Sequence, residues 1–243
     1  MKKIVLILVS IFAFSQANAQ PEVGSLSVTP RLGVNVSNVT DYRIGYQTVN
    51  GLTGYEKSSA AAGLHIGAEA EYQLTDLLYL SAGLDYSLQR FKVDNFVDFK
   101  GATPTEEYYV GTSDYKVKTG YVHLPVMVGC YVYNTLSVKL GLQLGLLTNA
   151  TLSYSNSNIQ VDATTRQRTY TSPTYTSVGL KDGMNKIDVS IPVGVAYEYE
   201  KVLLDLRYNW GLTKTFKHAS GHNHWAALTV GYRFDLGKFD LPF

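Results

Sequence analysis

The chain has 243 residues, of which 45% are hydrophobic, with 21 Lys+Arg against 20 Asp+Glu. This even charge balance, without a run of basic residues, argues against a nucleic-acid partner. A single cysteine, Cys130, excludes an internal disulfide and is interpreted as a small packing residue. Nineteen tyrosines suit a protein with aromatic bands at a membrane surface.

The N-terminus has the form of a secretory signal peptide over residues 1–19. Lys2 and Lys3 precede an apolar run at 4–14, and the small-residue site Ala-Asn-Ala at 17–19 precedes Gln20. The apolar run is about half the length that a membrane-spanning helix needs, so cleavage after Ala19 is expected. The remaining domain, 20–243, then carries 19 Lys+Arg against 20 Asp+Glu. It has no segment apolar enough for a transmembrane helix, so any spanning must use strands.

Eight stretches of the chain alternate apolar and polar residues. In the last stretch, Leu228, Val230 and Tyr232 share one face, while Thr229 and Arg233 share the other. This period of two predicts strands whose two faces have different surroundings. The predicted strands cover residues 26–38, 59–73, 77–91, 119–133, 136–154, 186–199, 202–216 and 224–236.

The links between the predicted strands alternate in length. Three are tight, at 74–76, 134–135 and 200–201, and the others are longer and polar, at 39–58, 92–118, 155–185 and 217–223. Outer-membrane barrels have short periplasmic turns and long external loops. We therefore predict an all-β fold, an eight-stranded antiparallel up-and-down transmembrane β-barrel, in the cell outer membrane of a Gram-negative bacterium.

Glycine placement predicts which face points outward. A soluble lipocalin-like barrel would turn its apolar face inward. Ten glycines share the polar parity, where a narrow lumen needs small residues and a solvated surface does not: Gly33, Gly63, Gly67, Gly83, Gly129, Gly141, Gly145, Gly194, Gly211 and Gly231. The apolar face is therefore expected to meet lipid. Aromatic residues near both strand ends, including Tyr86, Trp210 and Trp225 near the loops, agree with interfacial bands.

The inward parity also carries charged residues, which must pair because an unpaired buried charge is costly. We expect Asp205 and Arg207 to form a cross-strand network with Arg233 and Asp235. The expected lumen ion network comprises Arg31, Glu69, Asp205, Arg207, Arg233 and Asp235. A structural plug is favoured over a conduction path or proton relay, because eight strands leave space only for side chains. Inward prolines at 125 and 192 predict breaks in the strand pairing.

The link at 217–223 and its flank contain the candidates for chemistry. Ser220 lies among three histidines, but no carboxylate is present there to orient a base. The strand histidines, His65 and His123, are on the inward parity, away from lipid. Imidazoles can bind divalent metals, and the candidate ligands are His218, His222 and His224. Their spacing on a flexible turn leads us to expect no metal site and no cofactor. The missing carboxylate leads us to expect no enzymatic activity.

Three segments resemble the PorT-like family of outer-membrane β-barrels: VHLPVMVG at 122–129, LLDLRYNWGL at 203–212 and LTVGYRF at 228–234. The resemblance implies the barrel fold and an outer-membrane location. It assigns no catalytic residues, and the secretion role linked to the family's namesake implies an accessory function in protein export.

The function that we favour from sequence is non-enzymatic and uses the surface loops. The long links are rich in Ser, Thr, Asn and Tyr, as in the segment 164–177, and tyrosine gives large contact area at low entropy cost. The expected partners are outer-membrane lipid and a protein or glycan ligand at the external loops, with the chain a monomer. The alternatives are a lipid-modifying enzyme that uses the 218–224 loop, or a narrow channel.

Overall fold

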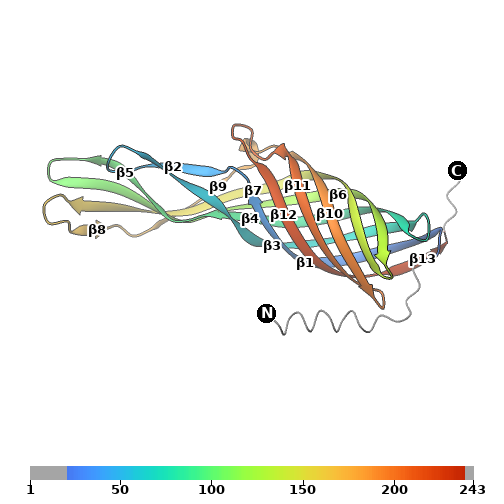
Figure 1. Cartoon of the computed structure of the whole chain (residues 1–243). Coiled ribbons are helices and arrows are strands. Elements are labelled where there is room, and N and C mark those ends of the chain that lie inside the picture. Colours follow the sequence, from blue (N-terminus) through green and yellow to red (C-terminus); the bar gives the residue numbers. More distant parts are fainter. Residues whose placement is uncertain (1–20, 239–243) are drawn as a thin grey trace.

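The computed structural model describes residues 21–238, and eight of its strands close into an antiparallel barrel (Figure 1). The expected export signal lies outside the described residues. The barrel strands are β1 Ser25–Val39, β3 Thr53–Gln73, β4 Leu78–Val93, β6 Glu106–Tyr133, β7 Leu136–Asp162, β10 Ile187–Tyr199, β11 Val202–Lys214 and β12 His222–Tyr232. The remaining elements are β2 Arg43–Gln47, β5 Phe96–Ala102, β8 Arg168–Tyr170, β9 Thr174–Gly179, β13 Phe234–Lys238 and the 3-10 turn η1 Lys181–Gly183.

The ring closes because β1, the first barrel strand, pairs both with the next barrel strand, β3, and with the last one, β12. Val34 lies opposite Leu228 of β12 on one side and Leu64 of β3 on the other. The tight links lie together at one end of the barrel, which we call the turn end. At one of them Glu200 and Lys201 have φ of 47° and 70°, and such left-handed turns match the natural twist of a hairpin.

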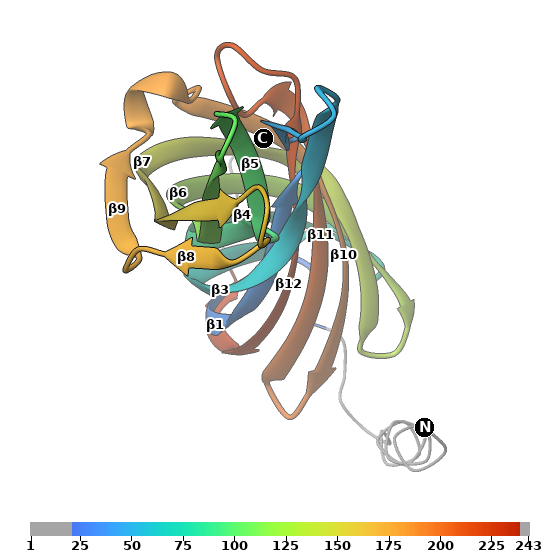
Figure 2. The same ribbon diagram turned by 90° about the vertical axis from the view of Figure 1, so that its left-hand side faces the viewer.

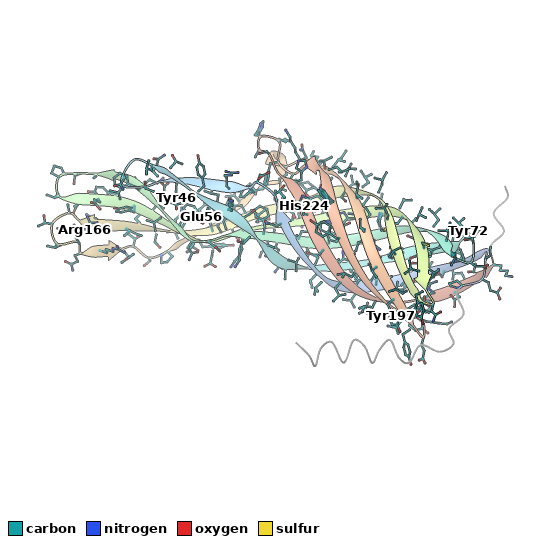
Figure 3. The ribbon with its side chains drawn as sticks, in the orientation of Figure 1. Tyr46, Glu56, Tyr72, Arg166, Tyr197 and His224 are labelled. Carbon is teal, nitrogen blue, oxygen red and sulfur yellow. The ribbon has the colours of Figure 1, made fainter. Side chains whose placement is uncertain are left out.

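The faces of the barrel are oriented as the glycine parity predicts. Leu206 is 55% exposed on the outside, whereas the next residue, Arg207, is 2% exposed. Outward positions of β4 from Leu78 to Leu88 are apolar or aromatic, a span that suits the 9–11 residues of a membrane-crossing strand. Tyr72 and Tyr197 lie near the turn end (Figure 3).

Two details of the last strand differ from the sequence-based expectation. Trp225 is 1% exposed in the lumen and does not belong to the outer aromatic band, because it shares the inward parity of Ala227 and Thr229. The eighth strand is also split: β12 ends at Tyr232 and β13 begins at Phe234, with Arg233 between them. A register shift in the β1–β13 pairing follows, between Leu26 and Ser27.

All four long links were predicted as loops, but three of them contain ordered β-structure. Strands β6 and β7 run for 28 and 27 residues, far more than a membrane requires. Together with β2, β5, β8 and β9 they form what we call the extension, residues 43–57, 96–114 and 154–179, which projects from the end opposite the turns (Figures 1 and 2). Within residues 21–238, no helix is long and apolar enough to cross a membrane.

The two inward prolines interrupt the pairing without shifting its register. Pairs between β4 and β6 stop at Ala82 opposite Val126 and resume at Asp85 opposite His123, on the same register. The β10–β7 pairs skip Pro192 in the same way. Pro125 packs against Gly83, where an added Cβ would lie 3.0 Å from the proline ring. Each break therefore accommodates a missing backbone N–H inside a continuous sheet.

Candidate functional site

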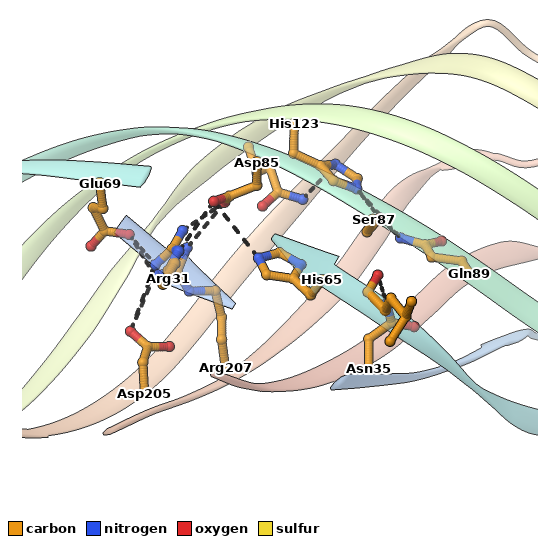
Figure 4. A network of polar contacts seen from close by, with 12 residues as sticks. Arg31, Asn35, His65, Glu69, Asp85, Ser87, Gln89, His123, Asp205 and Arg207 are labelled. Carbon is orange, nitrogen blue, oxygen red and sulfur yellow. Dashed lines mark hydrogen bonds and ion pairs between the residues drawn. The ribbon is translucent and has the colours of Figure 1, made fainter. Parts of the chain in front are cut away.

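Six charged side chains meet in the middle of the lumen, and we call them the ion cluster; Figure 4 labels all of them except Lys139. Five strands contribute to it, and every member is at most 4% exposed. The cations are Arg31 of β1, Lys139 of β7 and Arg207 of β11, and the carboxylates are Glu69 of β3, Asp85 of β4 and Asp205 of β11. Three cations and three carboxylates make the cluster electrically balanced.

Glu69 is the central acceptor of the ion cluster. Its carboxylate accepts from Lys139 Nζ at 2.8 Å and Arg207 Nη2 at 2.6 Å, and also from Arg31. Arg31 in turn donates to both oxygens of Asp85, with Nη2–Oδ2 at 2.6 Å and Nε–Oδ1 at 3.1 Å. Asp205 pairs with Lys139 and with Arg207. Such mutual pairing is what makes buried charge tolerable in a low-dielectric lumen.

A glycine makes room for the cluster. Gly67 of β3 lies directly opposite Asp85 of β4, and a Cβ at residue 67 would stand 2.0 Å from the carboxylate oxygen Oδ1. Only a residue without a side chain allows Asp85 to lean across its neighbouring strand toward Arg31. The glycine parity in the sequence therefore has a direct counterpart in the packing of the lumen.

The expected ion network divides into three places in the structure. Arg31, Glu69, Asp205 and Arg207 come together in the ion cluster. Arg233 lies apart from it, nearer the turn end, and pairs with Glu71 and with Glu198 at 3.1 Å. The expectation for Asp235 was wrong: its side chain is 49% exposed at the turn end and pairs with Lys201 at 3.1 Å.

Sequence reasoning left Lys139 and Asp85 out of the network. Both follow the inward parity, so the alternation places them in the lumen. Their partners, however, lie across the barrel: Glu69 is 70 residues from Lys139 in the chain. Only the register of non-adjacent strands brings them together, and local alternation carries no information about that register.

A layer of polar and aromatic side chains lies on the extension side of the ion cluster (Figure 4). Trp225 contacts the rings of His65 and His123, with centroids 5.4 Å and 5.1 Å away. His123 Nε2 is 2.8 Å from Ser87 Oγ, and Gln143 contacts the other ring nitrogen at 3.1 Å. This layer joins side chains of several strands into a hydrogen-bonded packing of the lumen.

An apolar cap follows where the barrel meets the extension. It consists of two clusters of buried residues with partly buried aromatic neighbours. Met184, directly after η1, is fully buried in one of them. Phe216 packs against both clusters, and Tyr42 packs against the second. The buried members are Tyr121, Leu147, Ala150 and Met184 in the first cluster, and Val39, Phe91 and Val117 in the second.

The histidines near residue 220 are dispersed. His224 faces outward, with Nδ1 3.1 Å from the Tyr208 hydroxyl and its ring 5.8 Å from that of Trp210 (Figure 3). His222 donates its backbone N–H to Thr40 Oγ1 at 3.0 Å, and His218 is exposed. Among residues 21–238, no group of three or more His, Cys, Asp or Glu side chains is placed to hold a metal ion.

The extension is held together by side-chain contacts as well as strand pairing. Tyr46 stacks on Phe96 at 5.6 Å, and the Gln47 backbone N–H donates to Asp98 at 2.8 Å, which ties β2 to β5. Near the tip, Glu107 accepts from the Tyr109 hydroxyl at 2.7 Å. It also pairs with Arg166 (labelled in Figure 3) at 2.8 Å. These two hydrogen bonds, from Tyr109 and then Arg166, lower the pKa of the Glu107 carboxyl.

The extension also contains an open cavity of about 350 Å³. Its walls combine two tyrosine rings, amides, hydroxyls and one ammonium group, supplied by β5 to β8 and the residues beside them. The polar and aromatic lining is Lys100, Tyr108, Tyr109, Asn158, Gln160, Thr169 and Thr171. Its volume falls within the range of small-ligand sites, and its side chains can stack on a ligand and hydrogen-bond to it.

Several solved structures are similar to this chain at low identity. Ail, the attachment invasion locus protein of Yersinia pestis, is 10% identical over 88% of this chain and 100% of that chain, with a TM-score of 0.41. OprG from Pseudomonas aeruginosa is 10% identical over 89% and 99%, with a TM-score of 0.37. Neisserial surface protein A is 14% identical over 88% and 97%, with a TM-score of 0.36.

No curated protein matches the chain in sequence. A family model does match, over residues 14–217, and its description is outer membrane protein beta-barrel domain. The match covers most of the strands that build the ring. The chain thus belongs to the outer membrane protein β-barrel domain family and is a protein of the bacterial outer membrane.

Proposed function

We propose that this protein binds a protein or glycan ligand outside the cell through its extension, and that the barrel is a closed anchor. The observation that carries the proposal is the extension itself, an ordered β-structure that membrane insertion does not require. Its surface presents tyrosines: Tyr55, Tyr170 and Tyr175 are 58%, 59% and 68% exposed. Exposed tyrosine gives contact area at low entropy cost, as in antibody combining sites.

The cavity favours binding of a specific ligand over non-specific adhesion. It places the Lys100 ammonium and the Asn158 and Gln160 amides near the ring of Tyr108. Stacking on an aromatic ring and several directional hydrogen bonds would together select a polar ligand with a flat face. A sugar or a peptide loop has this chemistry.

Ligand binding by the extension can be tested with the full chain in lipid vesicles. Fluorescent vesicles would be passed over arrays of glycans and of purified cell-surface proteins. We expect selective retention on a small set of spots, lost in Tyr55→Ala/Tyr170→Ala/Tyr175→Ala. The control, Tyr133→Ala, removes an exposed tyrosine at the turn end. Equal retention of all three proteins, or no selective retention of the full chain, would contradict the proposal.

If the barrel acts only as an anchor, it should neither conduct ions nor catalyse a reaction. Balanced ion pairs, a polar layer and an apolar cap occupy successive depths of the lumen. His224 is engaged with Tyr208 on the lipid side. We expect silence in single-channel recordings from planar bilayers. Lipid turnover by purified protein should be unchanged by Ser220→Ala/His222→Ala. Ion conductance, or turnover that this variant abolishes, would favour the channel or the lipid-modifying enzyme.

An accessory role in protein secretion is the second candidate, favoured by the resemblance of LLDLRYNWGL and LTVGYRF to the PorT-like family. Deletion of the chain from its host, with measurement of secreted protease in the medium, tests it. A secretion defect restored by the wild-type chain and equally by the tyrosine triple variant would place the function in export rather than in ligand binding.

A further inference from the structure

The outward face of β4 and β6 changes from apolar to cationic at one depth of the barrel. We call the four residues Arg90, Lys92, Lys116 and Lys118 the cationic rim. On β4 they follow Leu88, the last apolar residue of the outward series, and they lie on the extension side of it. All four are exposed, while Phe91 and Val117 between them are buried. The rim therefore points sideways, in the direction of the lipid-facing residues.

The strand register sets these cations directly against one another. Arg90 is opposite Lys118, and Lys92 is opposite Lys116. Like charges in directly opposed positions destabilise a sheet. Within residues 21–238, Asp114 pairs with Lys116 at 2.9 Å, and no ion pair reaches Arg90, Lys92 or Lys118. Three charges of the rim are thus left without a protein counter-ion.

The flanking strands add no negative charge at this depth. On β3, Ser59 and Ala61 lie opposite Lys92 and Arg90. On β7, Thr151 and Ser153 lie opposite Lys118 and Lys116. The rim is therefore a cationic patch bordered by small and hydroxyl side chains, which leave space for an anion to approach.

We propose that the cationic rim binds the phosphate groups of anionic lipids in the leaflet at the extension end. The edge of the apolar band is where lipid headgroups lie, so the charges face phosphate at the correct depth. Each Lys or Arg near an anionic surface strengthens binding to it, and Arg90 can hold a phosphate with two parallel hydrogen bonds. This inference does not depend on what the extension binds.

The test is lipid binding by the full chain, measured by native mass spectrometry from detergent. The probes are phosphatidic acid, which has an exposed phosphate, and phosphatidylcholine, whose phosphate is neutralised by choline. We expect preferential binding of phosphatidic acid, weakened about 10- to 100-fold in Arg90→Gln/Lys92→Gln/Lys118→Gln. Phosphatidylcholine binding should not change. The matched control, Arg43→Gln/Arg166→Gln/Arg168→Gln, removes the same charge from the extension and should bind like wild type.

A charge-conserving variant, Lys92→Arg/Lys118→Arg, separates charge from folding and should retain the wild-type preference. The proposal fails if this variant loses phosphatidic acid or if the rim triple variant keeps it. It also fails if the extension control loses as much. Soluble competitors identify the source of the phosphate: displacement of lipid by equimolar inorganic phosphate or by a sulfated polysaccharide would indicate a site for soluble anions and overturn the lipid assignment.

Discussion

The barrel and the extension are built from the same strands but are stabilised differently. Strands β6 and β7 run through both. Inside the barrel, each strand is paired on both sides, and buried ion pairs such as Arg31–Asp85 link distant strands. In the extension, β8 and β9 pair with β7 on one side, and ion pairs such as Arg166–Glu107 are partly exposed. The β6–β7 hairpin therefore runs from a closed barrel, whose lumen is filled by ion pairs, into an open sheet.

This contrast indicates which of the two regions tolerates amino-acid substitutions. Buried charges are costly when a partner is lost, whereas exposed ion pairs contribute little. Local opening also starts where burial is low and edges are free. We therefore expect the extension to accept substitutions of a kind that would unfold the barrel.

Removal of a central carboxylate should produce the largest loss of stability against unfolding. Glu69→Gln leaves Arg31, Lys139 and Arg207 sharing two carboxylates instead of three. Breaking a buried ion network in this way costs about 3–5 kcal/mol. Urea unfolding of the barrel in lipid vesicles, followed by tryptophan fluorescence and by the mobility of unheated samples in electrophoresis, measures the loss.

The matched variant in the extension is Glu107→Gln, which removes the same charge from the exposed pair with Arg166. We expect its urea midpoint to equal that of the wild type. If Glu107→Gln destabilised the barrel as much as Glu69→Gln, the two regions would form one cooperative unit and the contrast between them would be wrong.

Much of the barrel could be predicted from the sequence because lipid imposes a strict rule on it. Every strand must present apolar residues outward, so alternation such as Leu204, Leu206 and Tyr208 reveals both the strand and its orientation. The ion cluster was predicted only in part. Parity places Arg31 and Glu69 inside, but which inward residues meet depends on barrel-wide register.

Addition of a methyl group at a lumen glycine should cause the next largest loss of stability. Gly67→Ala would place a methyl group 2.0 Å from Asp85 Oδ1 and 2.6 Å from the Leu84 carbonyl oxygen. We expect a loss of about 1–3 kcal/mol from overpacking, read from the same urea midpoint.

Gly194→Ala is the control for this substitution, because its methyl group would approach no atom closer than 3.3 Å, at the Lys139 side chain. It should cost less than Gly67→Ala. If the two variants cost the same, the close approach of Asp85 to Gly67 would not be what requires glycine at that position.

The extension and the cationic rim escaped prediction for two different physical reasons. In water, both faces of a sheet can carry Ser, Thr and Tyr, so strands such as β9 lack the alternation that a membrane enforces. The rim is invisible in the sequence because Arg90 and Lys118 are 28 positions apart and come together only through the pairing of β4 with β6. An even total charge does not reveal such a patch.

The smallest expected effect concerns the turn at the tip of the extension. Asp162 accepts from the backbone N–H groups of Thr165 at 2.7 Å and Thr164 at 2.9 Å. Hydrogen bonds from Thr165 and then Thr164 lower the pKa of the Asp162 carboxyl. Because the folded value lies below that of the unfolded chain, this stabilisation is complete above the ordinary pKa and is lost as pH falls through the folded value.

Asp162→Ala should therefore loosen residues 163–167 at neutral pH, and acidification should do the same to the wild type. NMR order parameters for these backbone amides would report both changes, and a side-chain carboxyl titration would report the lowered pKa. The barrel's urea midpoint should stay constant in the variant, because the turn lies beyond the strands that close the ring. A titration of Asp162 at or above the ordinary aspartate pKa would show that these hydrogen bonds do not hold the turn. A shift in the barrel midpoint would show that the tip of the extension and the closed barrel are coupled after all.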